Sequence, residues 1–116
     1  MSAASQIPTE RNYQYEQLLS TAIKQHRKVR LRYRYDIHYR LFDPYILFKD
    51  ETGRVTVGGI RTTDERNPEK QPAPCKYEVG LITDIEVLTE PYDVDRRFSS
   101  YRPKYLNLQV LSAIDR

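Results

Sequence analysis

The spacing of apolar residues changes once along this chain, near residue 26, and that change limits the folds open to it more than any other feature. From Tyr15 to Ile23 the apolar residues recur every three or four positions, which is the spacing of an amphipathic helix. From Val29 to Tyr35 they alternate with arginines, which is the two-residue repeat of a β-strand that turns one face toward a core. With Asn12 as its N-cap, the pattern predicts a helix over residues 13–26 that leads directly into a strand.

Strand patterns continue as far as residue 90. After the first strand we expect four more, over residues 39–48, 54–60, 76–81 and 82–90. Pro44 cannot donate a backbone hydrogen bond and predicts a bulge, kink or edge position, whereas Gly58 and Gly59 predict a sharp bend or a close backbone approach. Residues 62–74 carry charges and three prolines but no apolar anchor, so they predict a long exposed loop.

Short strands joined by hairpins close most economically into a small barrel, because closure removes the exposed edges. The predicted fold class is therefore α+β, with the N-terminal helix packed on a five-stranded antiparallel SH3-like or Sm-like β-barrel over residues 28–90. Residues 1–11 have no periodic pattern and predict a flexible N-terminal arm. The pattern leaves the structure of the C-terminal extension, residues 99–116, open between a strand and a helix.

Composition limits the class of protein. A chain of 116 residues has the size of one domain, and its 39% hydrophobic and 30% charged residues are typical of folded proteins. No stretch approaches the roughly 20 apolar residues that cross a bilayer, and the N-terminus lacks the layout of a signal peptide. Cys75 is the single cysteine, which excludes an internal disulfide. These observations predict a cytoplasmic protein without a membrane partner.

Basic residues are concentrated in one segment. The net charge is +3, but residues 24–40 hold seven of the 19 basic residues and one of the 16 acids. Such asymmetry indicates an anionic partner.

Three arginines, Arg30, Arg32 and Arg34, lie on one face of the expected first strand. Alternate strand residues are roughly 6.6 Å apart, which is close to the spacing of phosphates along a nucleic-acid strand, about 6 to 7 Å. Guanidinium groups bind phosphate oxygens in pairs, so these arginines are candidates for phosphate contacts. The alternative is a solvated strand face paired with acids on neighbouring strands. Tyr33 and Tyr35 alternate with the arginines and are expected to pack in the core.

Several segments resemble the WYL domain, a bacterial module with a small SH3-like or Sm-like barrel. The resemblance covers about residues 18–98, and the matching segments are Leu18-Leu19 with Ala22-Ile23, Val29 to Tyr33, Arg40 to Leu47, Gly53 to Gly58 and Lys76 to Ile82. Val55, Thr56 and Val57 stand where the family has Trp, Tyr and Leu, and Glu78 and Leu81 stand where it usually has arginines. We assign a WYL-like domain to residues 12–98 and treat the extension as a candidate interface.

The resemblance implies a regulatory domain that senses nucleic-acid or nucleotide ligands in transcription and phage-defence control. We therefore predict a non-enzymatic, ligand-binding protein that recognises nucleic acid or a nucleotide-like anion and needs no cofactor. The residues expected to contact the ligand are Lys28, Arg30, Arg32, Arg34, Arg40 and Arg54. The alternative is a protein-interaction or homo-oligomerisation module without a nucleic-acid ligand, in which the extension forms the contact. A separate regulatory protein is a further candidate partner.

Signals for catalysis are weak. Cys75 lies in a different segment from His26 and His38, so the sequence indicates no nucleophile with a neighbouring base. Two histidines without a spaced carboxylate do not indicate a metal site, and no glycine-rich loop precedes a helix to hold phosphate.

Overall fold

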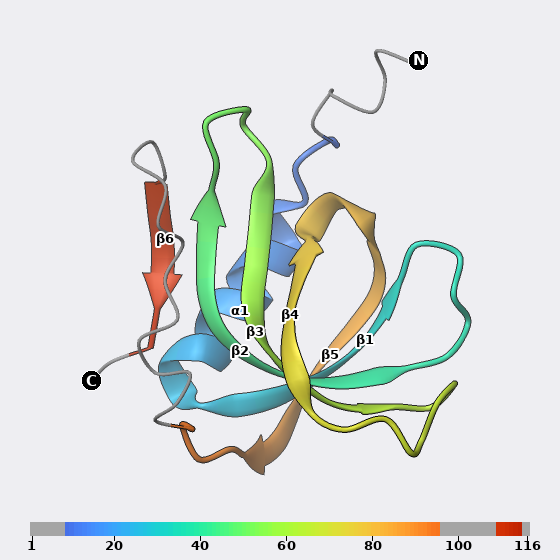
Figure 1. Ribbon diagram of the computed structural model, residues 1–116. Helices are drawn as coiled ribbons and strands as arrows, with labels where there is room; N and C mark the ends of the chain where they lie inside the picture. The colour runs from blue at the N-terminus through green and yellow to red at the C-terminus, as the bar shows by residue number, and fades with distance from the viewer. Residues whose placement is uncertain (1–8, 96–108, 115–116) are drawn as a thin grey trace.

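One helix packs on an antiparallel sheet of six strands, so the predicted α+β class is confirmed (Figure 1). The computed structural model describes residues 9–95 and 109–114. The elements are α1 (Tyr13–Gln25), β1 (Arg27–Tyr33), β2 (Arg40–Lys49), β3 (Val55–Asp64), β4 (Ala73–Glu78), the 3₁₀ turn η2 (Val79–Leu81), β5 (Ile82–Pro91) and β6 (Gln109–Ala113).

The strand order along the sheet is β4-β3-β2-β1-β5, and β6 pairs with β2 beside this path. β4 and β5 are the two ends of that order, so the sheet is open over the described residues and the expected closed barrel is not shown. The sixth strand comes from the C-terminal extension, where the sequence left strand and helix as alternatives. Val110 belongs to it and pairs with Phe48 of β2.

β2 is shared by three neighbouring strands. It pairs with β3 along its length, while its other edge pairs with β1 over residues 40–42 and with β6 over residues 46–49. A register shift between Pro44 and Ile46 separates the two halves, so of the bulge, kink or edge position expected at this proline the structure shows a bulge-like irregularity. Helix α1 contacts β1, β2, β5 and β6, and it lies behind the sheet in Figure 1. Its Leu19 and Ile23, both fully buried, complete the core.

Local chemistry explains where the elements begin and end. The Asn12 side chain accepts a hydrogen bond from the Tyr15 N–H at 3.0 Å, so the predicted N-cap is confirmed. His26, in a left-handed conformation with φ 52°, ends the helix. Gly59 sits against β2, where an added Cβ would lie 2.0 Å from the Asp43 carbonyl oxygen. The close backbone approach predicted at this glycine is therefore confirmed.

Four expectations about strands and loops were wrong. The strand expected over residues 76–81 ends at Glu78, and Val79–Leu81 form the 3₁₀ turn η2 instead. β1 ends at Tyr33, and Tyr35, which was expected in the core, is 99% exposed. The loop predicted over residues 62–74 is shorter, because β3 continues to Asp64 and β4 begins at Ala73. Residues 62 and 63 carry threonines, which favour strands, and they lie opposite Leu41 of β2.

The predicted flexible arm and the boundary at residue 98 lie mostly outside the described residues. Within the described part, Thr9 donates two hydrogen bonds to Glu78, from its backbone N–H at 3.1 Å and from its hydroxyl at 2.6 Å. Residues just before the helix are therefore attached to the end of β4.

Candidate nucleic-acid interface

Arg30 and Arg32 lie on the outer face of β1. Their neighbours Val29 and Leu31 are fully buried on the opposite face, as the alternating pattern predicts. Across the sheet, Arg30 pairs with Glu86 and Arg32 with Asp84 of β5.

Tyr39 connects the two arginines. The guanidinium carbon of Arg30 lies 4.1 Å from the centre of the Tyr39 ring, and that of Arg32 lies 4.2 Å from it. Both distances are typical of cation–π contacts. We call these three residues the Arg30–Arg32–Tyr39 cluster.

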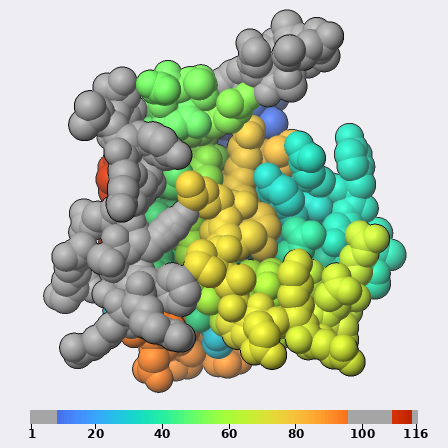
Figure 2. Space-filling view, viewed as in Figure 1, coloured from blue at the N-terminus to red at the C-terminus, as the bar shows by residue number. Residues whose placement is uncertain are grey.

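Two other segments hold Tyr39 in place. Its hydroxyl donates a 2.6 Å hydrogen bond to Asp84, which raises the pKa of Tyr39 and lowers that of Asp84. Its backbone N–H donates to the Glu65 carboxylate at 2.8 Å, and its carbonyl accepts from the Glu65 N–H at 3.0 Å. The β1–β2 and β3–β4 loops therefore lie side by side, as Figure 2 shows in teal and yellow-green.

Acids on β5 partly neutralise this face. Glu86 approaches Arg30 at 3.4 Å, but the two side chains are 59% and 43% exposed, so the ion pair is weak. The Nε atoms of Arg30 and Arg32 are buried and have no hydrogen-bond partner among the described residues. The alternative interpretation, a solvated strand face paired with acids, is therefore met in part. The acids of β5 are present, but they leave the Nε donors of Arg30 and Arg32 without a hydrogen bond.

The other four predicted contact residues are not members of the cluster, although Arg40 lines a cavity beside it. Lys28 is close to the cluster in sequence, but its ammonium group binds the buried Asp43 carboxylate at 2.9 Å. Arg40 lies opposite the buried Leu31 and so faces the interior, where it pairs with Asp36 at 2.9 Å.

Arg54 and Arg34 are not part of the Arg30–Arg32–Tyr39 cluster either. Arg54 follows the β2–β3 turn and lies 3.5 Å from Glu78. Arg34 follows a register shift between Arg32 and Tyr33, and its φ of 58° takes it off the strand face. The five arginines and one lysine predicted as one contact set therefore do not form one surface.

The sequence did not predict that Tyr39 would hold two arginines or that Arg61 would be buried. Nothing local marks Tyr39, because its position depends on Glu65 and Asp84, which are distant in sequence. Arg61 of β3 is only 5% exposed; its Nη2 donates to the Gln71 carbonyl at 2.8 Å, while its Nη1 has no partner among the described residues. Arg61 falls just after the predicted third strand, so its burial had no signal in the sequence.

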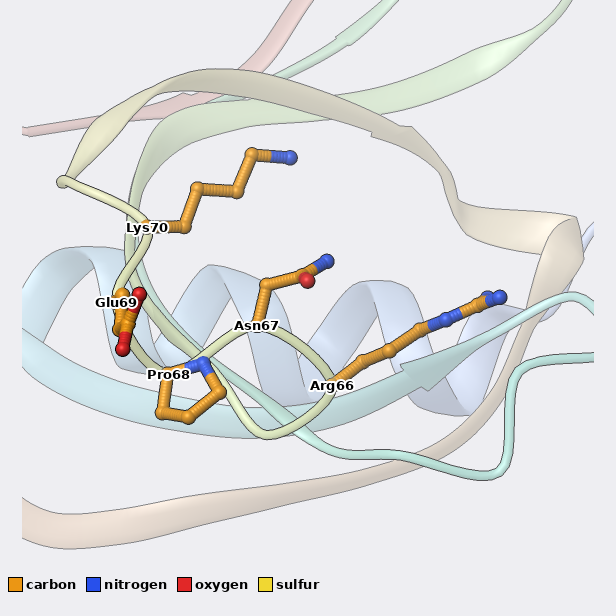
Figure 3. Close-up of a pocket in the computed structure, with 5 residues that line it drawn as sticks. All are labelled: Arg66, Asn67, Pro68, Glu69 and Lys70. Carbon is orange, nitrogen blue, oxygen red and sulfur yellow. The ribbon is translucent and has the colours of Figure 1, made fainter.

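The cavities lined by described residues include the following three. One of about 480 Å³ is formed by the β3–β4 loop, where Arg66, Asn67 and Lys70 point to the same side and Pro68 and Glu69 do not (Figure 3). The second, about 290 Å³, adjoins the cluster and is lined by Arg30, Tyr39, Arg40, Leu41, Thr63 and Glu65. The third, about 300 Å³, is lined by Arg34, Tyr35, Gly80, Leu81 and Thr83.

Comparison with protein-family models, curated proteins and solved structures gives no match to this chain. Over residues 9–95 and 109–114, no group of three or more His, Cys, Asp and Glu side chains could hold a metal ion. In the same part of the chain, no helix has the length and apolar character to span a bilayer.

Proposed function

We propose that this chain is a non-enzymatic regulatory domain that binds the phosphates of a single-stranded nucleic acid or a nucleotide on the Arg30–Arg32–Tyr39 cluster. The observation that carries the proposal is the placement of two guanidinium groups over one tyrosine ring, at 4.1 and 4.2 Å.

A guanidinium that rests its face on a ring keeps its N–H groups in the plane at its edge, where phosphate oxygens bind. The ring also fixes the orientation of both side chains, so less conformational entropy is lost when a ligand binds. Tyr39 is itself fixed by Asp84 and Glu65. The cluster is therefore ordered before any ligand arrives.

The acids on β5 do not prevent binding by this face. An exposed ion pair such as Arg30 with Glu86 contributes only about 0 to 1 kcal/mol. A phosphate can replace the carboxylate at the exposed guanidinium of Arg30. Phosphate contacts further release counterions from the nucleic acid, a gain that an internal carboxylate does not offer.

We also propose that the fold is a divergent, cytoplasmic WYL-like domain whose sheet curls toward an SH3-like barrel. Two features support this: the meander of β1 to β4 with β5 returning to pair with β1, and the connection of the two end strands by the three residues of η2. Interproton NOEs between the backbones of β4 and β5 test the curl. An experimental structure with β4 and β5 far apart would contradict it.

Fluorescence polarisation with labelled single-stranded oligonucleotides across a salt titration tests the binding function. Each phosphate contact to a single strand adds about 0.7 to the slope of log affinity against log salt. Arg30→Gln and Arg32→Gln should each lower that slope by about this amount. Lys24→Gln, which removes an exposed charge from α1, is the matched control. Equal slopes for all four proteins would sink the proposal.

A homo-oligomer formed through the extension is the second candidate function. It is favoured by Val110 of β6, a large apolar side chain that is 52% exposed. Val110→Asp should then convert an oligomer to a monomer in sedimentation velocity. Deleting the extension would be a poorer test, because it removes Ile114 from the core. A wild-type protein that sediments as a monomer at high concentration would exclude this candidate.

A further inference from the structure

We propose that the cavity between the β1–β2 loop and η2 holds one base of a single-stranded nucleic acid, with the base stacked on Tyr35 and a neighbouring phosphate on Arg34. This inference rests on the proposed function and deepens it, because it names the part of the ligand that phosphate contacts alone would not recognise.

Tyr35 is presented to solvent by a loop whose backbone is anchored. The Arg34 N–H donates to the Leu81 carbonyl at 2.9 Å, and the Asp36 N–H donates to the Tyr33 carbonyl at 3.2 Å. The tyrosine between them is nonetheless 99% exposed. A large aromatic side chain held by a fixed backbone and covered by nothing is a suitable platform for a base, because every base has a face that stacks on an aromatic ring.

Arg34 occupies an unfavourable backbone conformation. Its φ of 58° is rare for a residue with a side chain, and the bond to Leu81 holds it there. Such strained positions concentrate at ligand sites. This conformation ends β1 and directs Arg34 and Tyr35 to the rim of the cavity. Arg34 makes no ion pair with any residue in the described part of the chain, so its guanidinium needs no exchange of partners to bind phosphate.

The cavity has a size and lining that suit one nucleotide unit. Its volume of about 300 Å³ lies at the lower end of ligand pockets. Gly80 lines the wall through its backbone, because its Cβ position is turned toward Thr9. Leu81 offers apolar contact to a base, and the Thr83 hydroxyl can exchange hydrogen bonds with a base edge or sugar.

Continuity with the cluster favours nucleic acid over other ligands. Thr83 at the cavity immediately precedes Asp84, which lies opposite Arg32 in the sheet. Tyr35 is three residues beyond Arg32, a distance of at most roughly 10 Å along an extended chain. One nucleic-acid strand can therefore place phosphates on Arg32 and Arg34 and a base on Tyr35 within one or two nucleotide steps.

The test compares two ligands that carry the same phosphates. One is a fluorescent oligothymidine of twelve nucleotides, and the other is an oligomer of equal length built from abasic residues. The wild type should bind oligothymidine more tightly, and Tyr35→Ala should lose about tenfold affinity for it with little change for the abasic oligomer, as expected for one stacked base. Tyr35→Phe should retain the preference. Tyr13→Ala, at another exposed tyrosine on α1, is the control.

The outcomes separate this inference from the proposed function. If Arg32→Gln weakens both ligands while Tyr35→Ala changes neither, the phosphate face stands and the base site is wrong; the exposed loop then becomes a candidate surface for a protein. Equal losses of both ligands in Tyr35→Ala would also overturn the base site, because stacking requires a base. If the wild type binds neither oligomer at low salt, both proposals fail.

Discussion

The hydroxyl of Tyr39 donates to the carboxylate of Asp84 at 2.6 Å, so one acid of β5 holds the ring over which two arginines lie. The same acid lies opposite Arg32 in the sheet. Asp84 therefore both orders the cluster and competes with any anion that the cluster would bind.

Asp84→Asn should strengthen oligonucleotide binding by a few fold at low salt. The amide oxygen can still accept from Tyr39, whereas the negative charge opposite Arg32 is gone. Polarisation titrations at two salt concentrations measure the effect, which should shrink at the higher one. A loss of affinity would indicate that the charged Asp84 carboxylate helps binding more by ordering Tyr39 than it hinders binding by competing with phosphate for Arg32.

The ring of Tyr39 should matter more than its hydroxyl. Tyr39→Phe keeps the surface over which both guanidinium groups lie, so its affinity should fall by threefold or less. Tyr39→Leu removes that surface, and its affinity should fall by about tenfold, since cation–π contacts contribute about 0.5 to 2 kcal/mol. Isothermal titration of both variants with one oligonucleotide provides the comparison. Similar losses for the two variants would assign the role to the hydroxyl.

Gly59→Ala should lower the free energy of unfolding by about 2 to 4 kcal/mol, since its Cβ would meet the Asp43 backbone at 2.0 Å. Gly53→Ala offers a contrast. That glycine has φ 89° in an exposed turn, so the cost is conformational and about 1 kcal/mol. Urea denaturation of both variants measures the two values. A smaller loss at residue 59 than at residue 53 would contradict the close approach.

The turn after β2 should be sensitive to acid. Burial alone would raise the pKa of Asp50, but hydrogen bonds from Thr52 and Arg54 outweigh it and lower the pKa below its ordinary value of 3.8. A lowered pKa in the folded state means that the carboxylate stabilises the fold above pH 3.8 and that this contribution is lost as the pH falls through the lowered value.

Asp50→Ala should therefore destabilise the protein by about 1 kcal/mol at pH 7. The difference from the wild type should be smaller at a pH well below 3.8. Chemical denaturation at the two pH values tests this sign, and a difference that grows on acidification would refute it.

Arg61→Met should leave the free energy of unfolding unchanged or raise it by about 1 kcal/mol, because it removes a buried charge that no described acid pairs with. Methionine has a comparable length and fits irregular gaps. Thermal denaturation in phosphate-free buffer is the measurement. A loss of more than 1 kcal/mol would mean that Arg61 has an anionic partner outside the described residues.

Local signals predicted the parts of the fold that local contacts determine. The helix, its Asn12 cap and the outward face of Arg30 and Arg32 depend on residue spacing and on neighbours a few positions away. The end of β1 does not, because Arg34 leaves the strand through a bond to Leu81 that only the folded chain brings near. For this reason Tyr35 was expected inside and lies outside.

The candidate site was predicted in part for the same reason. Spacing identifies a shared face for Arg30 and Arg32 but cannot reveal that Lys28 binds Asp43 or that Arg40 faces Asp36 and the interior. The first pairing depends on the register between β1 and β2, and the second depends on the conformation of the loop that joins them. Tyr39, which organises the cluster, is held by Glu65 of the β3–β4 loop and by Asp84 of β5. No pattern in the sequence around Tyr39 marks it for this role.

The pairing of β2 with β6 sets the order in which the fold can be completed during synthesis. One edge of residues 46–49 has no strand beside it until residues 109–113 have left the ribosome. An unpaired edge of this kind recruits other chains. A nascent chain would then be exposed to misassociation until β6 emerges, along the part of β2 that carries Ile46, Leu47 and Phe48.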